Sequence, residues 1–360
     1  MFILQHAILQ RLSNASTFCI VRNIHSHLVL RKGYTTNQND VKNTIDNNPY
    51  YYSTSCDRKE NEKLLAPIRY LAQTPGTLTT TTFIKAINYW LKTPDDKLLP
   101  IKDIVNMLLL AATIVDDIQD NSIMRRDVPV AHAIYGIPHT LNAVNYVYFI
   151  GLERALSLQH PEAVKVYMEQ ALDFHRGQGI ELHWTTNCIC PTEADYKTMI
   201  KNKTAVFYFA QRVMQLFSTF TEDLSLITDT FRLLFFIGDD YCDIWLDEDV
   251  NSKGYCDDLA EGKVSLPIIH ALTNNLDNKE LISILKQRTK DNEVRRYCVH
   301  LLEKNGSFEY VKNVLEELDS IGRAEVERLG GNPLFVRLLD QLKTWNRKHA
   351  SKSTLDRLWH

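Results

Sequence analysis

Residues 104–120 read IVNMLLLAATIVDDIQD, an apolar run of helical length that ends in aspartates. The side chains before Asp116 are apolar on nearly all sides of a helix, which is typical of a helix in the centre of a bundle rather than on its surface. The four-residue spacing turns Asp116 and Asp120 toward the same side, where two carboxylates can share divalent cations. This stretch therefore predicts a core helix with acidic side chains at its end.

Residues 233–243 read LLFFIGDDYCD and repeat this arrangement. One acidic run is more often a solvated helix face, but a second one after an apolar stretch favours a metal site, because unpaired charge is costly to bury. Two facing carboxylate clusters suit Mg²⁺, which binds a few carboxylates together with substrate oxygens and water. We therefore predict that the clusters grip a diphosphate through Mg²⁺. The candidate phosphate-neutralising side chains are Arg125, Arg126, Lys203, Lys253 and Lys263.

Helical spacing continues through most of the chain after residue 60, and long alternating runs typical of strands are missing. The predicted helices include 104–118, 161–181 and 192–220. We therefore predict an all-α fold, a single large helical bundle over residues 61–360 with its ligand site between facing helices.

Residues 1–60 are predicted to form a tail outside this bundle. The first 39 residues contain no Asp or Glu but carry Arg11, Arg22, Arg31 and Lys32, the composition of a mitochondrial transit peptide. A plain disordered tail fits these residues equally well. The expected location is accordingly cytoplasmic, or mitochondrial if the tail is a transit peptide.

Composition and charge exclude several classes of partner. The net charge of -3 and pI near 6.5 give no basic field for nucleic acid or an anionic membrane. The uninterrupted apolar run 107–115 is shorter than the roughly 20 residues that span a bilayer, so we expect no transmembrane segment. Seven scattered cysteines without metal-site or disulfide spacing are expected to be reduced thiols of an intracellular protein.

Several motifs in order resemble those of geranylgeranyl diphosphate synthases, from about residue 63 to 330. They are DDIQDNSIMRR at 116–126, PVAHAIYG at 129–136, NYVYF at 145–149, HRGQG at 175–179 and DDLAEGK at 257–263. The resemblance implies the helical isoprenoid synthase fold of the class I terpenoid type, three Mg²⁺ ions and a homodimer. The residues that match the family's metal ligands are Asp116, Asp117, Asp120, Asp239, Asp240 and Asp243. Those that match groups around the allylic diphosphate are Arg125, Lys203, Thr204, Lys253 and Lys263.

The chain departs from this family at the site where the synthases bind isopentenyl diphosphate without metal. That site uses a Gly-Lys-x-x-Arg segment, a histidine seven residues before the first aspartate, and a second arginine after the motif. Here the three positions hold Thr77, Thr80 and Leu109, and Arg126 alone matches. Losing three donors to a charged group should weaken binding by several orders of magnitude, because each contributes about 1.5–3 kcal/mol.

Two further departures lie beside the second acidic cluster. The usual Phe-Gln-x-Arg before the aspartates is replaced by residues 235–238, FFIG, so an aromatic ring replaces an amide and a positive charge is lost. Aromatic faces attract cations without offering a nucleophile, which suits an uncaptured carbocation. Asp247 extends the spacing of Asp239 and Asp243 and resembles the second metal motif of terpene synthases, although an acidic loop explains it as well.

These observations predict a terpene synthase, a carbon–oxygen lyase that ionises an allylic diphosphate with Mg²⁺. We expect geranyl diphosphate as substrate and an acyclic or simple hydrocarbon such as ocimene or myrcene as product. The proposed catalytic residues are Asp116, Asp120, Asp239 and Lys203, with Arg126 an additional diphosphate ligand. Two alternatives stay open: a short-chain prenyl diphosphate synthase that tolerates the substitutions, and a silent partner subunit, which would not need intact aspartates.

Overall fold

The computed structural model describes residues 53, 57–74, 78–126, 128–245, 256–274 and 279–343. All of them belong to one compact unit, Asn48–His360. Residues 1–52, which hold most of the predicted tail, lie outside the described residues. So do Thr77, Asp247 and Lys253, about which the sequence makes specific predictions.

The described part of the chain consists of sixteen helices and one antiparallel pair of two-residue strands, which confirms the all-α prediction. In chain order the elements are α4 (Arg58–Leu64), α5 (Ala66–Ala72), α6 (Leu78–Leu91), α7 (Asp95–Gln119), β1 (Met124–Arg125), β2 (Val128–Pro129), α8 (Ala131–Tyr135), α9 (Ile137–Ser157), α10 (Pro161–Asn187), α11 (Glu193–Lys203), α12 (Ala205–Gln215), α13 (Ser225–Trp245), α14 (Asp257–Glu261), α15 (Leu266–Asn274), α16 (Lys279–Gln287), α17 (Asn292–Lys304), α18 (Ser307–Arg328) and α19 (Pro333–Leu342).

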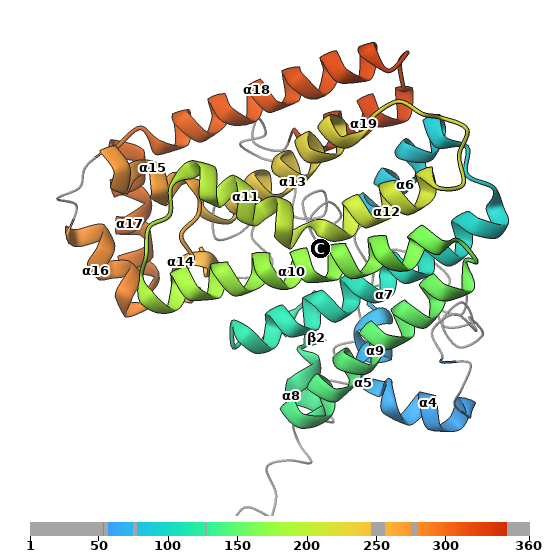
Figure 1. Ribbon diagram of the computed structural model, residues 1–360. Helices are drawn as coiled ribbons and strands as arrows, with labels where there is room; N and C mark the ends of the chain where they lie inside the picture. The colour runs from blue at the N-terminus through green and yellow to red at the C-terminus, as the bar shows by residue number, and fades with distance from the viewer. Residues whose placement is uncertain are drawn as a thin grey trace, which may run out of the picture. The chain divides into compact units, whose positions relative to one another are not determined.

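Helix α7 is the predicted core helix and packs against α9 and α12 (Figure 1). It starts nine residues before the predicted helix over 104–118, with Pro100 inside it. At 25 residues it is long and apolar enough to cross a membrane by length and composition, so the short apolar run 107–115 does not by itself decide whether this helix could span one. The core helix of a globular protein passes the same test, and packing against neighbouring helices is how α7 buries its apolar side chains.

Residues 192–220 form two helices instead of the single predicted one. The chain bends at Thr204, between α11 and α12, and both helices pack along α10 (Figure 1). Gly177 of α10 lies at the bend, where an added Cβ would come within 2.3 Å of the Lys203 backbone nitrogen. The glycine therefore permits a close approach that brings Lys203 against α10.

An aromatic cluster fixes α13, the helix that carries the second acidic run. Phe83 of α6 stacks on Phe231 with ring centroids 4.4 Å apart, and Phe207 and Phe335 pack edge-on against the same pair. Phe235 follows one turn later, 6.0 Å from Phe231. Because such clusters bury large apolar areas, α13 is held rigidly up to the turn before its first aspartate.

Candidate active site

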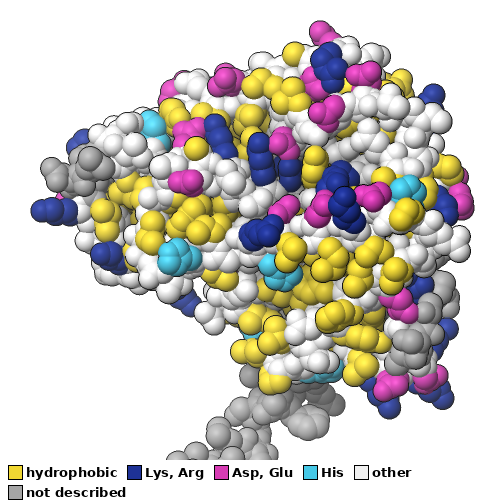
Figure 2. All heavy atoms as spheres, viewed as in Figure 1, with side chains coloured by type: hydrophobic (Ala, Val, Ile, Leu, Met, Phe, Trp, Pro, Cys, Tyr) yellow, Lys and Arg dark blue, Asp and Glu magenta, His cyan; other side chains and the backbone are white. Residues whose placement is uncertain are grey.

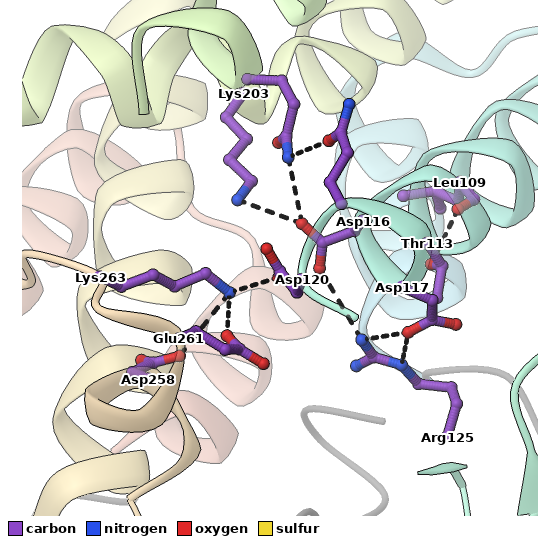
Figure 3. A network of polar contacts seen from close by, with 12 residues as sticks. Leu109, Thr113, Asp116, Asp117, Asp120, Arg125, Lys203, Asp258, Glu261 and Lys263 are labelled. Carbon is purple, nitrogen blue, oxygen red and sulfur yellow. Dashed lines mark hydrogen bonds and ion pairs between the residues drawn. The ribbon is translucent and has the colours of Figure 1, made fainter. Parts of the chain in front are cut away.

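Asp116 lies at the centre of a polar network at the end of α7 (Figure 3). Its Oδ1 accepts a hydrogen bond from Gln178 Nε2 at 3.3 Å and lies 3.5 Å from Lys203 Nζ. Gln178 also donates to Gln119 Oε1 at 2.8 Å. Three helices, α7, α10 and α11, therefore converge on one carboxylate.

Lys203 links this carboxylate to a second acid. Its ammonium group pairs with Glu181 of α10 and lies 5.4 Å from the centre of the Phe236 ring. Burial alone would lower its pKa, but Glu181 and Asp116 outweigh burial and raise the pKa of Lys203. Lys203 is therefore a fixed cation at neutral pH, with an aromatic face beside it.

Lys263 lies between the acidic runs of α7 and α13. Its Nζ is 2.8 Å from Asp120 Oδ2, 2.6 Å from Glu261 Oε2 and 3.8 Å from Asp258 Oδ1 (Figure 3). Gly262 ends α14 with a φ of 74°, which suits glycine, and the chain then turns Lys263 into the site. Because it contacts acids of α7 and α14, and its charge also acts on Asp240 of α13, Lys263 marks the place where an anionic group would be neutralised.

The second acidic run is tied to neighbouring helices. Tyr196 of α11 is fully buried and donates to Asp240 Oδ2 at 2.5 Å. Asp243 Oδ2 accepts from the backbone nitrogen of Asp258 at 3.0 Å. Asp239 is half-buried at the same end of α13. The structure therefore gathers Asp239, Asp240 and Asp243 near Asp258, beside Lys263.

Three predicted site residues have other partners in the structure. Asp117 is buried and paired with Arg125, whose Nη2 and Nε lie 2.6 Å and 2.8 Å from Asp117 Oδ1. The Thr204 hydroxyl is buried and donates to the Ile200 carbonyl at 2.6 Å. Asp117 as a metal ligand, and Arg125 and Thr204 as diphosphate ligands, stay predictions.

The site has a shortage of positive charge. Burial is the main cause that raises the pKa of Asp120 to about 6 and that of Asp240 to about 7, with nearby acids adding to the effect. The pKa of Asp258 is raised well above its usual value for the same reason. Carboxylates outnumber the cations Lys203, Lys263 and Arg125, so the site favours additional cations.

Mg²⁺ fits this donor set, although no metal site is complete by itself. Among the residues that the structure describes, no group of three or more His, Cys, Asp or Glu side chains is gathered so that it could hold a metal ion. The nearby groups are carboxylate oxygens, and Mg²⁺ ordinarily completes its coordination with substrate oxygens and water. The residues therefore fit metal ions that bind together with an anionic substrate.

We predict that Mg²⁺ stabilises the protein increasingly as the pH rises. A carboxyl group whose pKa is higher in the folded than in the unfolded protein resists losing its proton in the folded state. Its contribution to stability is therefore complete at pH values below the unfolded-state pKa. That contribution is lost as the pH rises through the folded-state pKa, about 6 for Asp120 and about 7 for Asp240. Without metal, the unfolding temperature should fall across this range, and Mg²⁺ should reverse the fall. Differential scanning fluorimetry with Mg²⁺ or a chelator measures this, with Asp240→Asn as the control that flattens the slope. A chelated protein with no fall would contradict it.

Six site residues were not predicted from the sequence, namely Gln119, Gln178, Glu181, Tyr196, Asp258 and Glu261. Gln178 and Glu181 are buried polar residues three apart on α10, and Gln178 stands in the quoted motif at 175–179. Asp258 also stands in a quoted motif, at 257–263. A search for polar residues on the apolar side of α10 could have found Gln178 and Glu181, whereas the partner of Tyr196 required the fold.

The positions of the isopentenyl diphosphate site carry no replacement cations where the structure describes them. Thr80 is 4% exposed and packed in α6, and Leu109 is half-buried on α7. Arg126 donates from Nη1 to Thr74 Oγ1 at 3.1 Å, and Thr74 precedes Thr77 by three residues. Burial is the main cause that lowers the pKa of Arg126. Apart from Arg126, the described positions of this site carry no cation.

Comparison with known proteins identifies the family. The family described as Polyprenyl synthetase matches residues 61–302. The chain belongs to the polyprenyl synthetase family. The resemblance to geranylgeranyl diphosphate synthases and the isoprenoid synthase fold are thereby confirmed. Members of this family generally use Mg²⁺.

Relatives within the polyprenyl synthetase family have two kinds of name. A protein named terpene synthase from Matsumurasca onukii is 48% identical over 296 residues, 82% of this chain and 98% of the relative. A geranylgeranyl pyrophosphate synthase from Mucor circinelloides f. lusitanicus is 39% identical over 288 residues, which cover 80% of this chain and 95% of the relative. A geranylgeranyl pyrophosphate synthase from Hypoxylon pulicicidum is 41% identical over 298 residues, which cover 81% of this chain and 78% of the relative. The chain is therefore an isoprenoid enzyme of the prenyltransferase or terpene synthase type.

Proposed function

We propose that this chain is a terpene synthase that acts on geranyl diphosphate and releases diphosphate and an acyclic hydrocarbon such as ocimene or myrcene. One observation carries the proposal: both acidic runs are intact around Lys203 and Lys263, whereas the site for a second, isopentenyl substrate has lost three of its four donors. An enzyme with only the first site can ionise an allylic diphosphate but has no partner to condense with it. The 48% identity to a protein named terpene synthase supports this choice.

The chain's cations hold the leaving group. Lys203 and Lys263, each protonated and held between acids, are positioned to neutralise diphosphate oxygens. Asp116, Asp120, Asp239, Asp240 and Asp243 are the oxygen ligands proposed to bind three Mg²⁺ ions, with Asp117 also assigned by its motif position. When bound, Mg²⁺ supplies positive charge that stabilises the departing diphosphate.

The reaction then has two steps. The allylic C–O bond breaks heterolytically, and its electron pair leaves with the diphosphate. The resulting carbocation loses a proton from an adjacent carbon to the released diphosphate, and the C–H electrons form a new C=C bond. Phe236 lies beside Lys203, where its ring face can stabilise positive charge. Apolar side chains of α7 and α13 exclude water, which would otherwise give an alcohol.

The alternative within the family is a short-chain prenyl diphosphate synthase. It is favoured by the relatives named geranylgeranyl pyrophosphate synthase and by the retention of Arg126. Product analysis distinguishes the two functions. We expect that geranyl diphosphate and Mg²⁺ alone, followed by extraction and gas chromatography, give a hydrocarbon. Farnesyl and geranylgeranyl diphosphates offered separately test chain length. A protein that releases no hydrocarbon from any of them is not a terpene synthase.

We also propose a homodimer that forms through α9 and α10. Figure 2 shows hydrophobic side chains gathered over these helices. The exposed apolar residues include Ile137, Leu141, Phe149 and Leu156 of α9 with Met168 and Leu172 of α10, and Phe149 is 70% exposed. Contiguous apolar patches of this kind mark protein interfaces.

We predict that Phe149→Glu converts the protein to a monomer, because a charge would be buried in the interface at a cost of several kcal/mol. Analytical ultracentrifugation measures the mass. Glu316→Ala, an exposed substitution on α18, should leave the mass unchanged. A wild-type protein that is monomeric at micromolar concentration would contradict the proposal.

A further inference from the structure

A cavity of about 680 Å³ lies apart from the acidic site, beyond the C-terminal end of α10. It is bordered by α15, α16, the start of α18 and the segment that joins α10 to α11, at one end of the bundle (Figure 1). Cavities that bind small molecules occupy roughly 300–1,000 Å³. The volume of this cavity lies within that range.

The lining is mainly apolar. The apolar side chains that line it are Pro191, Val264, Ile269, Leu272, Ile282 and Leu285. On the polar wall, the His270 ring stacks on Tyr310 with centroids 4.2 Å apart. Both ring nitrogens of His270 have partners, Ser307 Oγ at 3.0 Å and Asn274 Nδ2 at 2.8 Å, and the Tyr310 hydroxyl donates to Glu193. The polar side chains of this wall are thus largely hydrogen-bonded to other protein groups.

The charge of the lining disfavours an anion. Among the described residues that line the cavity, none is a lysine or arginine. Burial lowers the pKa of His270, so its ring is neutral at neutral pH. Burial alone would raise the pKa of Glu193, but hydrogen bonds from Lys197 and Tyr310 outweigh it and lower this pKa. A phosphate or carboxylate would therefore meet the carboxylate of Glu193, whose cationic partner Lys197 is not among the residues that line the cavity.

One short segment of the chain borders both the cavity and the acidic site. Gly262 and Val264 line the cavity, and Lys263 between them extends to Asp120 on the other side. A molecule in the cavity would pack on the short segment that positions this lysine. The cavity nevertheless lies apart from Asp116 and its partners, since Cys188 at its rim is ten residues along α10 from Gln178, roughly 15 Å at 1.5 Å per residue.

We propose that this cavity is a second ligand site, separate from the diphosphate site, that binds an uncharged and mainly apolar small molecule. The proposal rests on the volume, the apolar lining and the absence of a lining cation among the described residues. It does not depend on whether the enzyme is a terpene synthase or a prenyl diphosphate synthase.

Two exposed thiols, Cys188 and Cys190, line the cavity and report on its occupancy. The test measures the alkylation rate of each thiol by iodoacetamide, with mass spectrometry of the peptides, in full-length protein with and without farnesol. At ten times its dissociation constant a ligand leaves about one-eleventh of the sites free, so both rates should fall about tenfold. Farnesyl phosphate, which has the same chain and an anionic head, should leave both rates unchanged.

Cavity-filling variants provide the control. Ile282→Trp on α16 should abolish protection by farnesol, whereas Ile282→Val should retain it. Thr273→Trp at the exposed rim is a second filling variant if Ile282→Trp does not fold, as judged by circular dichroism. Unchanged alkylation rates with farnesol, equal protection by farnesyl phosphate, or full protection in a folded filling variant would each overturn the proposal.

Discussion

Asp116→Ala and Asp239→Ala are each expected to lower kcat by about a thousandfold or more with any prenyl diphosphate. Both side chains are proposed Mg²⁺ ligands from facing helices, and metal stabilisation of a leaving group contributes several kcal/mol, where each 1.36 kcal/mol is a factor of ten in rate. Removing Asp116 also leaves Lys203 and Gln178 without a shared partner. Steady-state turnover at saturating Mg²⁺ measures the effect.

Asp95→Ala provides a matched control, because Asp95 is an exposed aspartate in the first turn of the same helix. It should change kcat little, and circular dichroism should show that all three variants keep their helices. A near-wild-type rate for Asp116→Ala or Asp239→Ala would show that the carboxylates have been given the wrong role.

Restoring the second anion site is expected to produce the other large effect. Thr77→Lys, Thr80→Arg and Leu109→His together should confer binding of isopentenyl diphosphate, since three donors at about 1.5–3 kcal/mol each amount to several orders of magnitude in affinity. Single changes should have little effect, because anion sites need several donors that converge on one group. Isothermal titration calorimetry measures the binding.

Thr80 is the demanding position of the three, because its side chain is buried in α6 and an arginine must extend out of that packing. The same three positions changed to glutamine provide an uncharged control of comparable bulk. Binding by the glutamine variant as tight as that of the charged variant would show that charge is not what the site lacks. Wild-type protein that already binds isopentenyl diphosphate tightly would contradict the account directly.

The helices that carry the acidic runs were predictable because their signal is local. An apolar run precedes each of Asp116 and Asp239. In both places some fifteen consecutive residues are enough to predict the helix and the acidic side chains at its end. Helix α19 also had local signals, since Asn332 caps it and Pro333 occupies its first turn after two glycines. The sequence interpretation did not include it, although the information was present.

The bend at Thr204 could not be read from its own segment. Residues 203–206 contain no proline or glycine, and the hydroxyl of Thr204 continues to bond within the helix. What permits the bend is Gly177, on another helix, which allows the backbone of Lys203 to approach α10. The pairing of Asp117 with Arg125 likewise depends on the turn after α7, so the aspartates that look equivalent in sequence differ in the fold.

We propose that this chain ionises an allylic diphosphate without condensing it with isopentenyl diphosphate. The most direct measurement offers wild-type protein geranyl diphosphate and radiolabelled isopentenyl diphosphate together with Mg²⁺, and separates the extracted hydrocarbons from the prenyl diphosphates. We predict a hydrocarbon that carries no label and no labelled longer diphosphate. Labelled farnesyl or geranylgeranyl diphosphate, formed at an ordinary enzyme rate on the order of 1 per second, would instead show a prenyl diphosphate synthase.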